Sequence, residues 1–323
     1  MNPLVSFCLK SYNGRRYLRE ALAGAFAQTY RPLEIVISDD ASTDGSWDVI
    51  REEVAKHGKT DGVAVIVNRN ERNLGNLGNW EKICSLAHGE ILVKADGDDI
   101  LLPERTSRIV AAWLADGKRA TVVCHSGWQI GLKGEPKGRM RMVSAEYPHG
   151  AAMAYSSRLY SFFGKSAADG RLMDDEVYSR RALMLGSPLC IPDRLVRYRL
   201  GSGATSEEWN MRRRLAFCLK GNLEVRKCVV PDLEKLRALS EDAYRTWTDR
   251  LDREWSQILG KYRLVTGSAW TERLQGLRAM PPTRLVGVSM FLRMAFLMPR
   301  VVGSPMLFGY VLFRNVLRRL GVL

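Results

Sequence analysis

Residues 4–45 read LVSFCLKSYNGRRYLREALAGAFAQTYRPLEIVISDDASTDG and contain two apolar runs separated by a segment with helical spacing. The apolar runs, Leu4–Leu9 and Leu33–Ser38, have the length of buried strands. Between them, Tyr17–Ala27 places apolar side chains three and four residues apart, as one face of a helix requires. A strand, a helix and a second strand in this order predict a parallel pair joined by a crossover helix.

The same alternation continues beyond residue 45. Further strands are expected at Val63–Val67, Ile91–Ala95 and Ala120–His125, and further helices at Trp47–Ala55, Asn73–Ala87, Pro103–Leu114 and Val177–Leu185. Strands that alternate with helices predict an α/β fold with a doubly wound, mostly parallel sheet.

The chain changes character near residue 204. Residues 1–203 hold 28 Lys and Arg against 24 Asp and Glu, whereas residues 204–323 hold 21 against 11, so most of the net charge of +14 lies in the second part. Segments 206–227 and 231–263 are charged and rich in helix-forming residues, and segment 283–320 is apolar with widely spaced Arg. We therefore expect an α/β domain at 1–203 and a helical, basic C-terminal region at 204–323.

This basic region favours some partners over others. Amphipathic segments flanked by Arg can lie in the interface of an anionic membrane, or they can pack on the domain or on a second copy of the chain. The charge is not accompanied by a nucleic-acid-binding module, so nucleic acid is not expected. The longest uncharged stretch near the C-terminus, 301–313, is too short to span a bilayer. We see no signal peptide, and six cysteines without C-x-x-C spacing favour a reducing compartment, so we expect a cytoplasmic protein held peripherally at the inner face of the membrane.

Polar clusters follow three of the predicted strands. They are Ser11–Asn13, Asp39–Asp40 and Asp96–Asp99. Ligands of open parallel sheets bind outside the carboxyl ends of the strands, so the three clusters are expected to form one site.

Two of these clusters contain carboxylates. Asp96-Gly97-Asp98-Asp99 suits a hard divalent cation such as Mg²⁺, which one or two carboxylates and substrate phosphates usually hold. The alternative is a solvated acidic turn before the helix at Pro103. Asp39–Asp40 can accept a base N–H or a ribose hydroxyl, or it can serve as a turn and helix cap.

A third acidic group, Asp174–Glu176, precedes the helix expected at Val177–Leu185. Adjacent carboxylates repel one another, so enclosure raises at least one pKa, as a general base requires. The alternative is a favourable acidic helix N-terminus.

Several of these segments, in order, resemble family-2 inverting glycosyltransferases of GT-A fold. The resembling segments are 4–50, Asn73–Gly75 with Asn79, His88–Asp99, Leu102–Glu104 and a block from Met173 to Arg199. The resemblance spans about residues 1–203. It implies transfer of a sugar from a nucleotide-diphosphate donor, a UDP-sugar first of all, to a hydroxyl of a glycan or lipid-linked acceptor during cell-surface polysaccharide synthesis.

The resemblance also implies which residues contact the nucleotide sugar. They are Lys10, Ser11, Tyr12, Asp39, Asp40, Asn79, Asp96 and Arg199. Asp40 would bind the base with support from Asp39, and Asp96 would approach the ribose. Segment 201–206 lacks the His that is frequent in the family, so Arg197 or Arg199 would do more of the work at the diphosphate.

The same resemblance implies a metal-dependent mechanism. Asp98 would bind Mg²⁺ or Mn²⁺, and Asp175 would be the general base that deprotonates the acceptor. The family usually has Glu-Asp where this chain has Asp174-Asp175, so Asp174 remains an alternative base.

Residues 145–164 are implied to lie on the acceptor side. His149 is a candidate contact to the acceptor or the diphosphate, and a structural role is its alternative. Trp128 is expected in the core, with stacking on a sugar as its alternative.

Two other functions compete with that of an enzyme. The first is a non-catalytic scaffold subunit on the same fold, against which the acidic groups retained at all three positions argue. The second is a nucleotidyltransferase, against which the lack of a Gly-rich Lys/Arg phosphate loop near residue 10 argues.

Overall fold

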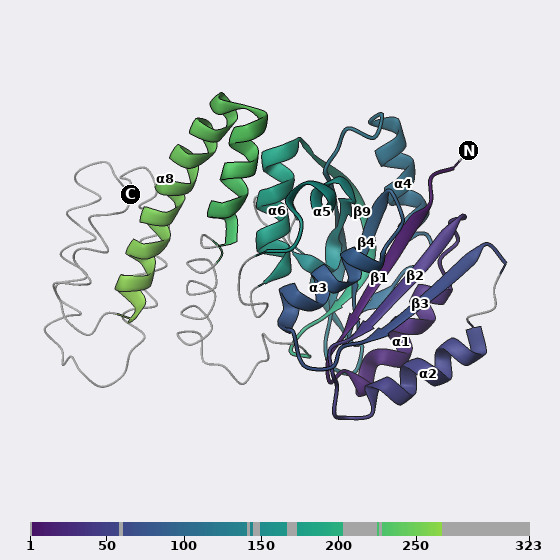
Figure 1. Ribbon diagram of the computed structural model, residues 1–323. Helices are drawn as coiled ribbons and strands as arrows, with labels where there is room; N and C mark the ends of the chain where they lie inside the picture. The colour runs from purple at the N-terminus through teal and green to yellow at the C-terminus, as the bar shows by residue number, and fades with distance from the viewer. Residues whose placement is uncertain are drawn as a thin grey trace, which may run out of the picture. The chain divides into compact units, whose positions relative to one another are not determined.

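The computed structural model describes residues 2–57, 61–140, 143–144, 149–166, 173–202, 225 and 228–266 (Figure 1). Its strands are β1 (Val5–Ser11), β2 (Leu33–Asp39), β3 (Val63–Arg69), β4 (Ile91–Asp96), β5 (Ile100–Leu101), β6 (Val122–Ile130), β7 (Pro136–Arg139), β8 (Met153–Ser156) and β9 (Pro188–Arg199). Its helices are α1 (Arg15–Phe26), α2 (Ser46–His57), α3 (Gly75–Leu86), α4 (Arg105–Ala115), the 3₁₀ turn η1 (Gly150–Ala152), α5 (Arg158–Phe163), α6 (Asp174–Leu185) and α8 (Glu241–Thr266).

The strands form one sheet in the order β3-β2-β1-β4-β8-β6-β9-β5, with β7 paired to β6. β1 is parallel to both β2 and β4, and β2 is parallel to β3. The short β8 lies antiparallel between β4 and β6, and β9 is parallel to β6. The long strands therefore point the same way, which confirms the predicted mostly parallel sheet.

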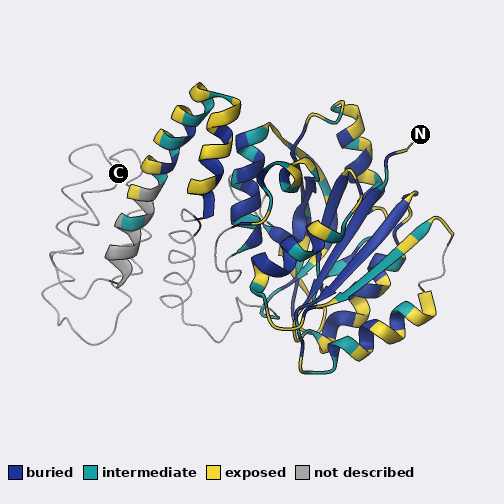
Figure 2. Cartoon of the chain, viewed as in Figure 1, coloured by how far each residue is buried: buried dark blue, intermediate teal, exposed yellow. Residues whose placement is uncertain are grey.

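Helices cover both faces of this sheet (Figure 1). α3 packs on β1 and β2 and contacts α5 and α6, whereas α1 packs on β1, β5 and α2, and α4 packs on β6 and β9. β1 and β2 are consequently buried along their whole lengths (Figure 2). Strands covered on both faces are expected to be largely apolar, and these two are, apart from their C-terminal ends and from Ser6 and Glu34, which are buried and hydrogen-bond to each other.

The helices and strands expected up to residue 125 are present, with ends that differ by a few residues. β9 is the long strand that the apolar pattern does not predict. Its first seven residues alternate between exposed and partly buried, so it lacks the continuous apolar run of a central strand.

The expectation that Trp128 belongs to the core is wrong, because its side chain is 39% exposed. Trp128 pairs with Arg139 of β7, a strand whose four residues are all exposed. This end of β6 therefore lies at the solvent-facing margin of the sheet.

The chain forms two compact units, one of Met1–Glu208 with Glu224–Thr248 and the other of Trp209–Leu223 with Asp249–Leu323. Helical residues 228–239 and α8 agree with the helical character expected for 231–263. The apolar segment expected at 283–320 lies outside the described residues. In the part of the chain that the structure describes, no helix is both long and apolar enough to cross a membrane.

A buried ion pair connects α6 with helical residues 228–239 inside the first unit. Arg181 Nε and Nη2 donate to the two carboxylate oxygens of Asp232 at 2.7 and 3.1 Å, and both side chains are almost fully buried. Arg181 Nη1 donates to the Gly164 carbonyl at 3.0 Å and lies 3.6 Å from Glu81. The bidentate geometry satisfies both partners in the interior.

Replacing one partner of this pair should destabilise the first unit strongly. Asp232→Ala leaves the Arg181 guanidinium buried without its principal counter-charge, and such a loss costs about 3–5 kcal/mol of unfolding free energy. Urea unfolding followed by near-UV circular dichroism measures the change. Arg237→Ala is the control, because Arg237 forms an exposed pair with Glu241 and its loss should leave the unfolding midpoint near that of the wild type. Equal midpoints for both variants would show that the buried pair contributes little.

Candidate active site

The predicted site residues gather at one edge of the sheet, where the parallel strands end. In the sheet register, Lys10 of β1 lies beside Asp96 of β4, and Ser11 lies beside Asp39 of β2. Arg199 is the last residue of β9, which runs in the same direction. The expected convergence of the polar clusters on one edge is confirmed.

Two buried lysines hold carboxylates from different elements together. Lys10 Nζ lies 2.8 Å from Asp174 and 3.2 Å from Asp96, and it also donates to Asn76. Lys94 Nζ lies 3.1 Å from Asp96 and 3.4 Å from Asp174. Burial alone would lower the pKa of Lys94, but Asp174 and Asp96 raise it above its ordinary value. Burial alone would raise the pKa of Asp96, but Lys10 and Lys94 lower it, so Asp96 and Lys94 are held in their charged forms.

Asp175 has a different environment from Asp174. Its Oδ2 accepts the backbone N–H of Gly150 at 2.9 Å, and among the described residues it forms no ion pair with Lys or Arg. Burial, followed by the charge of Asp174, raises the pKa of Asp175 to about 6. Gly150 allows this approach, because a Cβ there would lie only 2.4 Å from Lys94 Nζ. Asp175 is therefore a carboxyl that can change its protonation near neutral pH.

The turn after β4 carries two more carboxylates. Asp98 is partly exposed, and its Oδ2 accepts the Ser202 hydroxyl at 2.7 Å. Burial and the charge of Asp96 raise the pKa of Asp98. Asp99 is fully buried and accepts the backbone N–H of Arg199 at 2.9 Å. Asp99 thus anchors the turn to β9, while Asp98 is the more accessible of the two.

Arg199 supports this turn from within the protein. Its Nε donates to the Asp98 carbonyl at 2.9 Å, and its Nη2 lies 2.9 Å from Glu20. Its Nη1 donates to the carbonyls of Gly131 and Leu132 at 3.3 and 3.2 Å. All three guanidinium nitrogens have protein partners, and a direct contact of Arg199 with a nucleotide sugar stays a prediction.

Asp40 caps helix α3. Its Oδ1 accepts Asn70 Nδ2 and the Leu74 N–H, both at 2.8 Å, and its Oδ2 accepts the Gly75 N–H at 2.9 Å. The two backbone donors belong to the first turn of α3, where N–H groups lack partners within the helix. The capping alternative considered for Asp39–Asp40 is therefore realised by Asp40.

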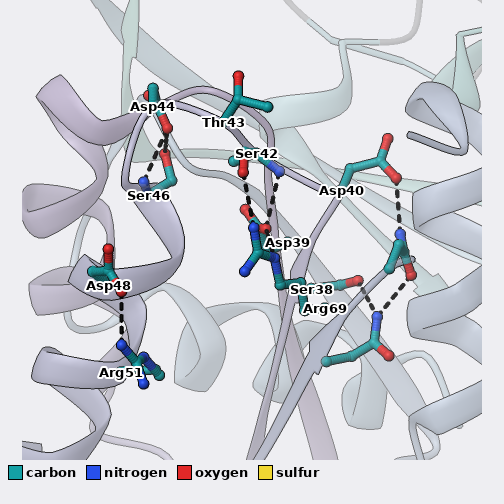
Figure 3. Close-up of polar contacts among 12 residues, drawn as sticks. Ser38, Asp39, Asp40, Ser42, Thr43, Asp44, Ser46, Asp48, Arg51 and Arg69 are labelled. Atoms are coloured by element: carbon teal, nitrogen blue, oxygen red, sulfur yellow. Dashed lines mark hydrogen bonds and ion pairs between the residues drawn. The ribbon is translucent and has the colours of Figure 1, made fainter. Parts of the chain in front are cut away.

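Asp39 is turned toward Ser42 and Arg69, and Asp40 away from them (Figure 3). Asp39 Oδ2 accepts the Ser42 N–H at 3.1 Å and lies 3.5 Å from Arg69 Nε. Its Oδ1 is buried and has no hydrogen-bond partner among the described residues. The Ser11 hydroxyl, beside Asp39 in the register, is likewise buried without a partner. Buried polar atoms normally have partners, so each of these two atoms keeps an unused hydrogen-bonding capacity.

The remaining two predicted nucleotide contacts differ in exposure. Tyr12 follows β1 and is 53% exposed. Asn79 is buried, accepts the Ser38 hydroxyl at 2.6 Å and Asn70 Nδ2 at 3.1 Å, and donates to the Ser38 carbonyl at 3.2 Å. Asn79 thus attaches α3 to β2, and the nucleotide contacts of both residues stay predictions.

His149 lies next to the residue that binds Asp175. Its ring centre is 4.3 Å from that of Tyr198, and its Nδ1 is buried without a hydrogen-bond partner among the described residues. Burial lowers the pKa of His149 to about 4, so the imidazole is neutral at pH 7. Its contact with acceptor or diphosphate stays a prediction.

The turn at Asp98 can hold a divalent cation. In the described ranges, no three His, Cys, Asp or Glu side chains form a ligand set. Mg²⁺, however, commonly takes only one or two carboxylates and completes its shell with phosphate and water. Burial and Asp96 both raise the pKa of Asp98, so a cation there would offset an unfavourable negative charge. Asp98 therefore fits the predicted role.

Three residues take part in this site without being named among the predicted catalytic, nucleotide or metal contacts. Lys94 ion-pairs with two carboxylates, Gly150 binds Asp175, and Ser202 binds Asp98. Lys94 alone had a visible signal, because it is the one charged residue inside the apolar strand Ile91–Ala95. Gly150 and Ser202 lie far along the chain from their partners, so only the fold reveals them.

The chain is similar to curated bacterial proteins over part of its length. It is 31% identical over 109 residues to EpsE of Bacillus subtilis (strain 168), which covers 34% of this chain and 38% of EpsE. It is 29% identical over 185 residues to the abequosyltransferase RfbV of Salmonella typhimurium, which covers 57% of this chain and 49% of RfbV. The matches thus span half or less of these relatives.

Solved structures share the fold at low identity. Residues 1–349 of S. aureus TarS, in complex with UDP-GlcNAc, superpose with a TM-score of 0.54 at 15% identity and cover 85% of this chain and 88% of that one. The mannosyltransferase PcManGT of Pyrobaculum calidifontis, with GDP-Man and Mn²⁺, gives 0.56 at 16% identity, with 98% and 81% covered. The fold is that of the GT-A glycosyltransferases, as predicted.

Residues 6–174, more than half of the chain, match the family model described as "Glycosyl transferase family 2". The matched range contains β1 from its second residue, all of β2 and β4, and the first residue of α6, and thus most of the site edge. The chain belongs to glycosyl transferase family 2.

Proposed function

We propose that this chain is an inverting, metal-dependent transferase that moves a sugar from a nucleotide-diphosphate donor to an acceptor hydroxyl, with Asp175 as the general base. The observation that carries the proposal is the contrast between two neighbouring carboxylates. Asp174 is buried in ion pairs with Lys10 and Lys94, whereas Asp175 forms none in the described structure and its pKa is raised to about 6. We therefore assign the proton-accepting role to Asp175 rather than to Asp174.

In this mechanism the acceptor hydroxyl transfers its proton to Asp175 while its oxygen bonds to the anomeric carbon of the donor. The bond from that carbon to the diphosphate oxygen breaks, and the nucleoside diphosphate leaves with the electron pair. Attack opposite the leaving group inverts the anomeric configuration. The Gly150 N–H that binds Asp175 Oδ2 at 2.9 Å orients the base.

The donor is proposed to bind at the ends of β1 and β2. TarS and PcManGT were solved with UDP-GlcNAc and GDP-Man, so a UDP-sugar, our first choice, and a GDP-sugar are both candidates. The resemblance assigns the nucleotide base to Asp40, but three donors occupy that carboxylate. We propose that Asp39, whose Oδ1 has no partner among the described residues, binds the nucleotide base instead. The Ser11 hydroxyl lies beside it.

Asp98 is the residue proposed to hold Mg²⁺ or Mn²⁺. A bound ion supplies positive charge that stabilises the leaving diphosphate. Arg199 and Ser202 keep Asp98 in place through its carbonyl and its Oδ2. PcManGT was solved with Mn²⁺, which supports the assignment.

The acceptor is proposed to be a glycan or lipid-linked hydroxyl in polysaccharide synthesis. The names of two relatives support this proposal, since RfbV is called an abequosyltransferase and EpsE a putative glycosyltransferase. We retain the proposal that residues 204–323 hold the protein at the inner face of an anionic membrane, with pairing of two copies as the alternative.

Asp175→Asn should abolish transfer while leaving the donor site intact. Loss of a general base lowers kcat by about 10²–10⁴-fold, and the KM for the donor should stay within about twofold. Release of nucleoside diphosphate measures the rate. Asp174→Asn is the comparison variant and should lower the thermal midpoint, because it removes the counter-charge of two buried ammonium groups. If Asp174→Asn loses kcat at unchanged stability and Asp175→Asn stays active, Asp174 is the base.

Activity should fall in acid. Below the pKa of Asp175, about 6, the folded protein carries this carboxyl protonated, and a protonated carboxyl cannot accept the acceptor proton. kcat/KM should therefore rise through a midpoint near pH 6 and level off above it, falling about tenfold per pH unit on the acid side. Donor binding measured at the same pH values is the control and should change little. A flat profile between pH 5 and 7 would exclude this role.

Nucleotide binding should depend on both Asp98 and Asp39. UDP and GDP with Mn²⁺ are offered separately, and at least one should raise the thermal midpoint of the wild type; EDTA should reduce the shift. Asp98→Ala should lose only the part of the midpoint shift that EDTA removes from the wild type. Asp39→Asn should instead weaken nucleotide binding about tenfold both with and without metal, because it loses a charged hydrogen bond. An EDTA-insensitive shift that Asp98→Ala retains would refute the metal role, and the lack of any shift would favour a scaffold.

A further inference from the structure

A cluster of three arginines surrounds Trp128 on the exposed side of β6, β7 and β9. We call Trp128, Arg139, Arg194 and Arg197 the arginine patch. The three arginines are exposed, and Trp128 is 39% exposed. Trp128 is the register partner of Arg139 on one side and of Arg197 on the other, so strand pairing brings residues far apart in sequence together.

The indole holds two of the guanidinium groups. The Arg194 guanidinium carbon lies 4.9 Å from the centre of the Trp128 ring, and that of Arg139 lies 5.8 Å away. Both distances are within the range of cation–π attraction. Stacking on an aromatic ring limits the rotamers of a long side chain, so less entropy remains to be lost when its N–H groups bind a ligand.

The N–H groups of the patch are free in the described structure. Arg139, Arg194 and Arg197 have no ion pair or hydrogen bond to any described side chain. The acidic residues next to them in sequence are engaged elsewhere, because Glu135 pairs with Lys137 at 3.2 Å and Asp193 with Arg108 at 2.6 Å. Among the residues that the structure describes, these three positive charges therefore have no ion-pair partner.

The patch lies beside the proposed active edge. Arg197 is two residues, about 7 Å along the strand, before Arg199, which binds the carbonyl of Asp98. The residue between them, Tyr198, contacts the ring of His149, next to the Gly150 that binds Asp175. Successive residues of a strand face opposite sides of the sheet, so Arg197 and Tyr198 point to opposite faces of β9, and a long acceptor with its hydroxyl at Asp175 would reach the patch by passing around the end of this strand.

We propose that the arginine patch binds phosphate groups of a water-soluble, phosphate-bearing acceptor glycan. Guanidinium groups form paired N–H···O bonds with phosphate, which fixes both distance and direction. A membrane is the less favoured partner, because the two guanidiniums over the indole reduce the apolar surface that Trp128 could insert into lipid. Among the described residues of the β6–β7 connection, only Leu132 adds an exposed large apolar side chain. This assignment of the acceptor rests on the proposed transferase function, but the binding itself does not.

Fluorescence anisotropy with a fluorescein-labelled glycerol-phosphate oligomer tests the proposal on the full chain. Excess UDP, GDP and Mn²⁺ occupy the proposed donor site throughout. The triple variant Arg139→Gln, Arg194→Gln, Arg197→Gln should raise the Kd of the oligomer at least about tenfold. Trp128→Leu should raise it about threefold or more while retaining all three charges, because the guanidiniums lose their support.

A charge-matched control separates the patch from the general charge of the protein. Arg51→Gln, Arg119→Gln and Arg245→Gln replace three exposed arginines that form local pairs elsewhere, and this variant should keep the Kd within about twofold. Thermal midpoints check that all variants are folded. A labelled dextran of similar length should not bind, because it lacks phosphate.

Three results would overturn the proposal: equal oligomer affinity of wild type and patch variant, equal binding of dextran, or patch-dependent binding of phosphatidylglycerol vesicles without patch-dependent binding of the oligomer. The last result would assign the patch to a membrane. The protein could also bind the oligomer through the patch and yet transfer no sugar from any UDP- or GDP-sugar tested. That result would refute the proposed function but support the phosphate site.

Discussion

The organisation of the site edge depends on the burial of two ammonium groups, those of Lys10 and Lys94. A buried ammonium is stable only beside an opposite charge, and here Asp96 and Asp174 supply it. The four residues come from β1, β4 and α6, so α6 must pack against the sheet before the charges in the strands are balanced. The same contacts place Asp175, the next residue of α6, at the end of the parallel strands.

Neighbouring aspartates at this edge have different surroundings. Asp174 is held by ammonium groups, whereas Asp175 has a backbone N–H and a raised pKa; Asp40 caps α3, whereas Asp39 keeps an unpartnered oxygen. In each pair, one carboxylate stabilises the local structure and leaves the other available for a ligand or a proton. The acidic clusters therefore combine the structural and functional roles that looked like alternatives.

Arginine has three separate uses in this fold. Arg181 joins α6 to helical residues 228–239 through Asp232, and Arg199 ties the turn at Asp98 to β9. Both are buried and fully engaged. The arginines of the arginine patch are exposed and have no counter-charge in the described structure, although Arg197 is only two residues from Arg199. Burial and pairing, rather than residue type, separate the arginines that stabilise the fold from those that can bind a ligand.

The sequence by itself determined the parallel α/β sheet, because strands covered by helices on both faces need continuous apolar runs, and the order of strand and helix sets their connection. It also placed Asp39, Asp96 and Asp98 at one edge, since parallel strands end together. β9 escaped prediction because its pattern alternates, and Trp128 proved exposed because β6 ends beside the exposed β7. Tertiary structure alone decided which carboxylates are paired. The contacts of Lys94 with Asp174 and of Gly150 with Asp175 join distant segments of the chain. The charge and hydrogen bonds of a buried carboxylate depend on such contacts, and spacing along the chain does not reveal them.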